Sequence, residues 1–205
     1  MLECRKDPPT EAEKRDLATY INAPTTAVSL PFMEKPMPIS MYRSTIPVFQ
    51  RGLETLKTYL DKAEAFAMEK GIDSKDLVAA RLASDMLPFS GQFQRATDSA
   101  KLAIARLTAS EAPKFEDNET TIAELRARVA KTEAYLGTVA PAALEETETR
   151  EITLSPGGKK ITFRGDEYVM TFALPNFFFH VATAHAILRN QGVPVGKMDY
   201  LGRLA

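Results

Sequence analysis

The side chains best suited to proton transfer in this sequence are its two histidines, His180 and His185. An unperturbed imidazole has a pKa near 6.5, which suits general acid or base catalysis at neutral pH. The two residues are five positions apart, which separates their directions on a helix by about 140°. Two histidines that bind one metal ion from one helix are three or four apart. We therefore expect no chelation by this pair, and we take His180 as the candidate catalytic residue and His185 as a boundary or surface residue.

Four further polar side chains are candidates for a ligand-binding pocket beside His180: Arg81, Asp85, Gln92 and Asn176. Asn176 precedes His180 by one helical turn and could orient it. Arg81 and Asp85 are expected beside Gln92 on one flank of a second helix, where Arg81 could hold an anionic group and Asp85 could fix the arginine. The alternative is a set of separate structural hydrogen bonds, with Arg81 and Asp85 forming an ordinary i,i+4 ion pair. Gln94 and Asp98 fall on the opposite flank and are expected to form a solvated face.

Composition excludes several other chemistries. The 205 residues carry 26 basic and 27 acidic side chains, for a net charge of −1, so the sequence offers no basic surplus for a nucleic-acid partner. A single cysteine, Cys4, excludes an internal disulfide framework and argues against a Cys/His zinc cluster. Neither GxxxxGK[ST] nor GxGxxG occurs. The longest uncharged apolar stretch, Phe172 to Ala184, is shorter than the ~20 residues of a membrane span, and no signal sequence is evident. We therefore expect a cytoplasmic protein with no membrane partner.

Four apolar stripes with spacings of three and four predict the helices that position these residues. They run over residues 46–67, 82–107, 122–139 and 174–188, with a kink or break expected before Pro88. Two alternating runs, at 151–154 and 160–163, predict a β-hairpin before the last helix. Such stripes can bury one another only in a helical bundle. The expected fold is all-α: a four-helix bundle over 37–202 with an inserted hairpin, a three-residue tail (203–205), and an extended or partly disordered extension over 1–36, unless Met37 is the authentic start.

Four stretches carry a resemblance to a known family: Met37–Arg43 with Ile46–Phe49, Ala80–Phe89 continuing to Gln94, Pro113–Leu125, and Phe172–His180 followed by Ile187–Arg189 and Gly192–Val193. Together they resemble the bacterial and fungal family called domain of unknown function 1993, which is grouped with the DinB/YfiT-like metalloenzyme superfamily. The resemblance implies a bundle that commonly holds a divalent metal through three histidines. If Arg189 matches the arginine after the second ligand, two ligand positions fall at Ala184 and Leu188, and Asp85 is the nearest substitute for the third. A helix-turn-helix label carried by some fungal members finds no support in the near-zero charge.

Two functional hypotheses follow, and the sequence leaves open whether the protein is an enzyme. In the first, the bundle binds a small molecule in a polar pocket beside its core, without the usual metal and without any other predicted cofactor. In the second, it is a non-catalytic bundle that associates with itself, because Phe177, Phe178 and Phe179 span about 200° of a helix and cannot all face one core. A homodimer is expected on this ground. A metal-dependent or thiol-dependent transferase is a weaker third reading, supported by the resemblance alone.

Overall fold

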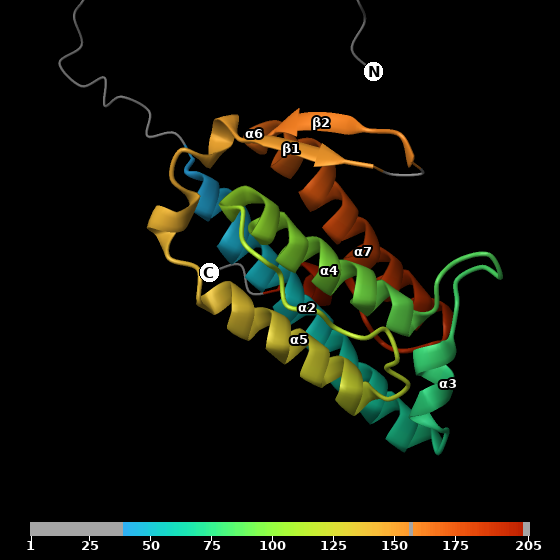
Figure 1. The fold of residues 1–205 in the computed structure, drawn as a ribbon. Helices are drawn as coiled ribbons and strands as arrows, with labels where there is room; N and C mark the ends of the chain where they lie inside the picture. Colours follow the sequence, from blue (N-terminus) through green and yellow to red (C-terminus); the bar gives the residue numbers. More distant parts are fainter. Residues whose placement is uncertain (1–38, 156–157, 203–205) are drawn as a thin grey trace, which may run out of the picture. The chain divides into compact units, whose positions relative to one another are not determined.

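The computed structural model describes residues 39–155 and 158–202. Four long helices make up most of this part of the chain (Figure 1): α2 (Met41–Lys70), α4 (Phe89–Thr108), α5 (Ile122–Gly137) and α7 (Leu174–Asn190). Around the bundle they follow the order α2, α5, α4, α7, with α7 returning to α2. The predicted all-α four-helix bundle is therefore confirmed. The predictions for residues 1–36, including Cys4, for Met37 as a start and for the 203–205 tail lie outside the described residues.

Short elements connect the long helices: α3 (Ser74–Ala79), two 3₁₀ turns (Pro141–Leu144 and Thr147–Thr149), β1 (Glu151–Leu154), β2 (Ile161–Arg164), α6 (Gly165–Tyr168) and α8 (Lys197–Leu201). The two strands form the predicted antiparallel hairpin, with Ile152 opposite Phe163. Figure 1 shows this hairpin at one end of the bundle and α3 at the other. The hairpin is too small to form a core of its own, and Ile152 and Leu154 bury their side chains against the helices.

The predicted stripes form the core. Phe49, Leu53, Phe93, Leu125 and Leu188 are each 0% exposed. On α4 the stripe consists largely of small side chains, Ala96, Ala100 and Ala103, all fully buried. Small residues at these positions let α4 approach the neighbouring helix α7 closely, so polar side chains on the flanks of the two helices come within hydrogen-bonding reach of each other.

The helix ends follow the expected capping chemistry. Gly71 ends α2 in the left-handed conformation (φ 64°), where its lack of a Cβ removes the steric cost. The predicted capping box of α5 is present, because Thr121 Oγ1 accepts the Glu124 backbone N–H (3.2 Å) and the Glu124 carboxylate accepts the Thr121 N–H (2.9 Å).

The second predicted helix is shorter than expected. Residues 80–88 are not helical, and α4 begins only at Phe89, directly after Pro88. Proline disfavours helical geometry at the residue before it and cannot donate a backbone hydrogen bond, so the break expected near Leu87 becomes a complete interruption. We call this segment the 80–88 loop. Its two ends are joined by a hydrogen bond from the Phe89 N–H to the Ala80 carbonyl (2.8 Å).

The last helix is longer than predicted. Helical structure is continuous over Gly165–Asn190, with a π-helical turn at Val169–Ala173. This turn lies just before Pro175, which has no N–H for the carbonyl four residues earlier. By length and composition alone, this is the one helix of the described chain that could cross a membrane. Core helices pass the same test, and here Phe177, Val181, Ala184 and Leu188 form part of the bundle core.

Candidate functional site

His180 and Gln92 lie together, as the sequence predicts. His180 Nδ1 is 2.8 Å from Gln92 Oε1, across the contact between α7 and α4. Gln92 is 2% exposed, and its Nε2 donates to the Leu87 carbonyl (3.0 Å). A carbonyl can only accept, so the amide nitrogen must face Leu87 and the amide oxygen must face the imidazole. His180 therefore carries its proton on Nδ1, and its Nε2 is a hydrogen-bond acceptor.

The surroundings of His180 disfavour its charged form. Burial lowers the pKa of His180 to about 4, and the positive charge of Arg95 lowers it further. The unperturbed pKa near 6.5 therefore does not apply to His180 in this environment, because desolvation penalises the imidazolium. At neutral pH His180 is uncharged and cannot act as a proton donor through Nε2. Among the described residues the one sealed side-chain oxygen or nitrogen without a hydrogen-bond partner is Tyr135 Oη, so His180 Nε2 is not completely sealed from solvent.

One turn before His180, Asn176 lines a separate small pocket between α4 and α7. Asn176 Nδ2 donates to Ser99 Oγ (2.7 Å), and the Ser99 hydroxyl donates in turn to the Arg95 carbonyl (2.6 Å). The cavity measures about 200 Å³, and we call it the α4/α7 pocket; its polar lining residues are Arg95, Asp98, Ser99, Arg106, Tyr168 and Asn176. Arg95 joins this pocket to His180, because it lines the former and acts electrostatically on the latter.

Arg106 is the cation of the α4/α7 pocket that no carboxylate of the described residues neutralises. Its Nη1 donates to the Tyr168 hydroxyl (2.8 Å), and no carboxylate within residues 39–155 or 158–202 pairs with it. Arg95, by contrast, forms ion pairs with Asp98 (3.3 Å) and Asp117. Burial raises the pKa of Tyr168, and the hydrogen bond from Arg106 partly offsets that rise, so the phenol stays protonated at neutral pH. The pocket therefore offers the positive charge of Arg106 beside neutral hydrogen-bonding groups and beside Asp98, whose carboxylate is already paired with Arg95.

Arg81 and Asp85 do not share a helical flank with Gln92. Both lie in the 80–88 loop and are exposed. Arg81 Nη1 donates to the Met86 carbonyl within that loop, so the predicted ion pair with Asp85 does not form. The prediction was wrong because it extended the helix through the segment that Pro88 interrupts. Of the five predicted site residues, the structure joins Gln92 with His180, places Asn176 one turn away, and puts Arg81 and Asp85 in the neighbouring loop.

His185 lies on the other side of α7, as predicted, and is half-buried. Its Nδ1 is 3.1 Å from the hydroxyl of Tyr59, which is fully buried on α2. Its ring also contacts that of Tyr200 on α8, with centroids 6.4 Å apart. Burial lowers the pKa of His185, Arg189 adds to this, and Asp199 opposes it. His185 is therefore a packed boundary residue that helps join α2, α7 and α8.

Gln94 and Asp98 do not form a solvated face. They belong to a polar cluster around Arg128, a residue of α5 that is 2% exposed. The three guanidinium nitrogens lie within 3.0 Å of five acceptors: Thr97 Oγ1 (2.7 Å), the Glu116 carbonyl (2.9 Å), Glu119 Oε1 (2.8 Å), Asp98 Oδ1 (3.0 Å) and Asp117 Oδ1 (3.0 Å). Gln94 Nε2 donates to Glu119 Oε2 (2.9 Å). The cluster fastens the connection between α4 and α5 to both helices.

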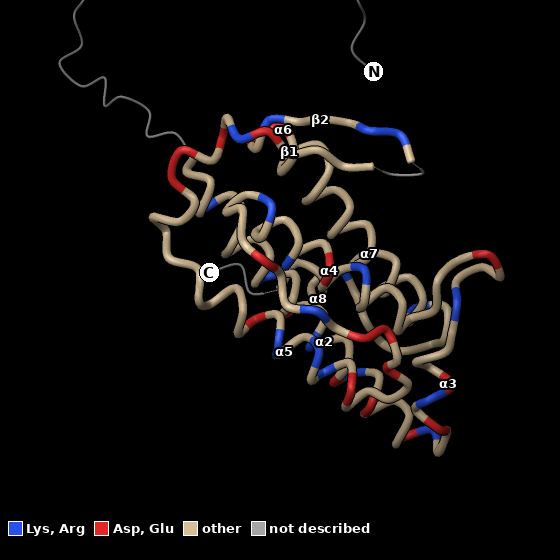
Figure 2. The backbone as a smooth tube through the Cα atoms, in the orientation of Figure 1, with Lys and Arg blue, Asp and Glu red and all other residues tan. Residues whose placement is uncertain are grey.

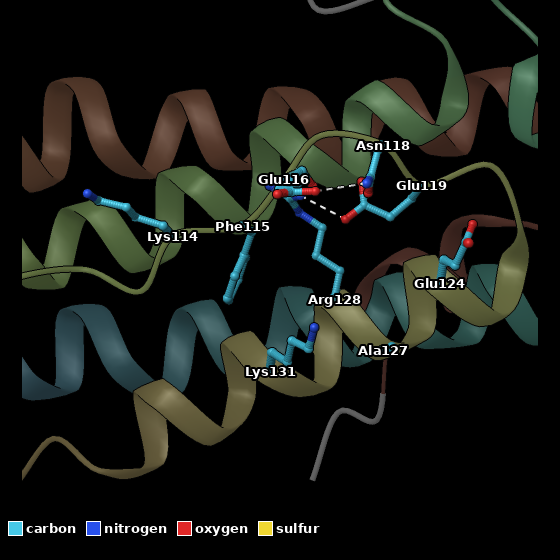
Figure 3. A pocket seen from close by; sticks show the side chains of 9 residues that line it. All are labelled: Lys114, Phe115, Glu116, Asn118, Glu119, Glu124, Ala127, Arg128 and Lys131. Atoms are coloured by element: carbon cyan, nitrogen blue, oxygen red, sulfur yellow. Dashed lines mark hydrogen bonds and ion pairs between the residues drawn. The ribbon is translucent and has the colours of Figure 1, made fainter.

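Beside this cluster lies a hollow of about 340 Å³. Figure 3 shows the side chains that line it, with Arg128 pointing to the connecting segment. The guanidinium already makes four hydrogen bonds to the protein and an ion pair with Asp117, so most of its donors and its charge are used within the fold. Phe115 packs against it, with Arg128 Cζ 5.3 Å from the ring centroid. We therefore assign this hollow a structural rather than a ligand-binding role, and the α4/α7 pocket with His180 remains the candidate site.

The residues at the metal positions implied by the resemblance do not fit a metal. Ala184 and Leu188 are apolar and 0% exposed within the core, and Asp85 lies in the exposed 80–88 loop. Within the part of the chain that the structure describes, no three His, Cys, Asp or Glu side chains gather closely enough to hold an ion. Alkyl side chains supply no lone pair, so no step of chemistry can be assigned to a metal at these positions.

Sequence reasoning missed Arg95, Ser99, Arg106 and Tyr168. On α4 the signal was present, because positions 92, 95, 99, 102 and 106 repeat with helical spacing along one flank. Recognising it required knowing which flank of α4 faces α7, and that depends on how the helices pack against one another. Tyr168 could not have been found in this way, because it lies before the π-helical turn, in a segment that the sequence analysis did not predict as helix.

The arrangement of four helices with a hairpin before the last one defines a DinB-like helical bundle. The crystal structure of a DinB family member from Shewanella denitrificans is similar to it: the match covers 80% of this chain and 92% of that chain, with 42% sequence identity and a TM-score of 0.76. The profile of the family described as a domain of unknown function (DUF1993) matches residues 41–201. The chain therefore belongs to the DUF1993 family, as its motifs indicate. No match is found among curated proteins.

Proposed function

We propose that this DUF1993 bundle binds a small organic anion in the α4/α7 pocket. The observation that carries the proposal is Arg106, a half-buried cation with no carboxylate partner among the described residues and with a neutral tyrosine as its hydrogen-bond partner. At about 200 Å³ the pocket is smaller than the roughly 300–1,000 Å³ of sites for drug-sized molecules. A compact carboxylate or phosphate fits both this volume and this charge.

The neighbouring groups define the rest of the ligand. The Asn176 amide oxygen has no hydrogen-bond partner within the described chain, and His180 Nε2 is an open acceptor one turn further along α7. The proposed ligand therefore carries its anionic group at Arg106 and a hydroxyl, amine or thiol that can donate toward α7. In this role His180 is an uncharged acceptor, and any catalysis would use it as a weak base. No divalent metal takes part.

The test is to titrate the full chain with a panel of small carboxylates and phosphates and to measure binding by thermal shift and calorimetry. Arg106→Gln should weaken binding of a hit by roughly 10- to 100-fold, the equivalent of one lost charged hydrogen bond. Arg189→Gln, an exposed arginine elsewhere on α7, should leave it unchanged. A panel without any saturable binder, or equal affinities for the two variants, would refute the proposal. Stoichiometric zinc, nickel or iron by elemental analysis would refute the metal-free part.

The exposed face of α7 favours a second function, self-association. Phe179 is 58% exposed, and the exposed residues Pro175 and Ala182 lie four and three positions from it, on one helical face. Met170, in the π-helical turn before α7, is 62% exposed. Figure 2 shows this helix uncharged along most of its length. Phe178 is half-buried and Phe179 exposed, so the core accommodates Phe177 alone of the three aromatic residues. Light scattering should give the mass of a dimer, and Phe179→Glu should reduce it; a monomer at high concentration would exclude this function.

A further inference from the structure

A second, larger hollow lies on the opposite side of α7, away from the α4/α7 pocket. It measures about 590 Å³ and is formed by α2, α7 and α8. Its apolar surface comes from Pro47 and Val48 on α2, Phe178 on α7, and Tyr200 and Leu201 on α8. We call it the α2/α7/α8 groove. It shares no lining residue with the α4/α7 pocket, so it is independent of the proposed function.

The floor of this groove is held rigidly. Gly52 lies under the ring of Phe177, and a Cβ at position 52 would stand only 2.2 Å from Phe177 Cε1. The absence of that Cβ lets α2 and α7 approach closely. The Phe177 ring meets those of Phe49 and Phe178 edge to face, with centroids 5.1 and 5.2 Å apart. Phe178, which lines the groove, is thus fixed by an aromatic neighbour that is itself fully buried.

α8 closes the groove through hydrogen bonds from α2. Arg51 Nε donates to the Leu201 carbonyl (3.0 Å), and Thr55 Oγ1 donates to the Tyr200 carbonyl (3.1 Å). Both bonds go to the backbone, so the apolar side chains of α8 are free to line the hollow. The groove is therefore preformed, which lowers the conformational entropy that a ligand must overcome.

All charged side chains that line the groove are positive. Its charged lining side chains are Arg43 and Arg51, eight residues apart on α2, which places them about 12 Å apart along the helix axis. Within residues 39–155 and 158–202 no carboxylate pairs with either arginine, and Nη1 of Arg51 has no acceptor. Nearby, Glu54 is paired with Lys57 (2.6 Å) and Asp199 with Lys62 (2.8 Å). An apolar floor between two cations that no described carboxylate neutralises complements an amphiphilic anion.

We propose that the α2/α7/α8 groove binds an aliphatic carboxylate, a medium-chain fatty acid anion, with its carboxylate at Arg43 and its chain over Val48 and Phe178. The apolar floor excludes compact ions such as phosphate as good ligands, because they would leave its surface uncovered. The arginines exclude amphiphilic cations. This combination distinguishes the groove from the α4/α7 pocket, whose smaller volume admits no such chain.

Calorimetric titration of the full chain with hexanoate, octanoate and decanoate tests the proposal. Each methylene that enters the groove should tighten binding up to about fourfold, so decanoate should bind roughly tenfold or more tightly than hexanoate. Decylammonium and decanol, with the same chain and a different head group, should bind at least about tenfold more weakly than decanoate, because charged hydrogen bonds are lost. Equal affinities for the three decyl compounds would overturn the proposal.

Two variants locate the site. Arg43→Gln, at an exposed position, should weaken decanoate binding by about tenfold, and Val48→Glu should abolish it by placing a carboxylate on the floor. Arg189→Gln is the matched control and should bind as the parent chain does. Arg106→Gln should also leave decanoate binding intact, which separates this proposal from the function assigned to the α4/α7 pocket. If decanoate does not bind while Val48→Glu halves the mass measured by light scattering, the groove belongs to a second copy and the proposal is wrong.

Discussion

Arg128 holds the connection between α4 and α5 in place, and its replacement should be among the most destabilising changes in the protein. Arg128→Leu leaves Glu119, which is only 9% exposed, without its cation. Asp98 and Asp117 also lose Arg128 but keep their ion pairs with Arg95. Removing one partner of a buried ion pair costs about 3–5 kcal/mol, a large part of the roughly 5–15 kcal/mol that stabilises a domain. Arg128→Lys keeps the charge but loses the planar fork and should cost about 1.5–3 kcal/mol.

The matched control is Arg126, two positions away on the same helix. It pairs with Asp61 (2.6 Å) and Glu64 (3.1 Å), but its side chain is 36% exposed and its partners are 64% and 55% exposed. Arg126→Leu should therefore cost less than about 1 kcal/mol. Urea unfolding of the three variants gives the free energies directly, provided that the m-value is unchanged. If Arg128→Leu and Arg126→Leu prove equally destabilising, the buried cluster does not stabilise the fold as argued.

Three further predictions test the description of the core. The pKa of His180 is about 4 in the folded protein and about 6.5 when unfolded, so the unfolded state binds more protons between these pH values. The free energy of unfolding should therefore fall as pH drops from about 6.5 to 4, by at most about 1.4 kcal/mol per pH unit. His180→Gln should flatten that pH dependence. Gly52→Ala should destabilise the fold by about 1–3 kcal/mol, because the new Cβ would collide with Phe177. Gly137→Ala is the control: its Cβ would meet nothing within 4 Å, so the change should be neutral or stabilising. Thermal unfolding of both variants measures the difference. Tyr135→Phe removes a sealed hydroxyl without a partner and should raise stability by about 1 kcal/mol in the same assay, so a loss of stability would contradict the assignment.

The fold was predictable because it depends on periodicity. Phe49, Leu53, Leu125 and Leu188 follow from helical spacing alone, and all four are fully buried. Even the capping box at Thr121 and the hairpin were visible in local sequence. Each of these features is decided by residues within one or two turns of one another, so no knowledge of tertiary packing was needed.

The candidate site was only partly predictable, because it depends on contacts between elements. Gln92 and His180 were placed together correctly by their position beside the core stripes, although 88 residues separate them. Arg81 was misplaced because the break expected before Pro88 extends back to residue 80, and the regular stripe concealed that extent. The cluster around Arg128 escaped notice for a different reason: an arginine in an amphipathic helix is ordinarily exposed, and its burial depends on carboxylates from a connection that has no periodicity.

The amide of Gln92 gives the imidazole of His180 a role as a reporter. One carboxamide holds the 80–88 loop through Leu87 and fixes the tautomer of a ring on α7. The amide cannot rotate without breaking both hydrogen bonds, so loop position and proton position are thermodynamically linked. Undocking of the loop would release the amide and let the imidazole proton exchange between its two nitrogens. Nitrogen-15 shifts of one ring would therefore record the motion of a loop that the ring does not itself hydrogen-bond.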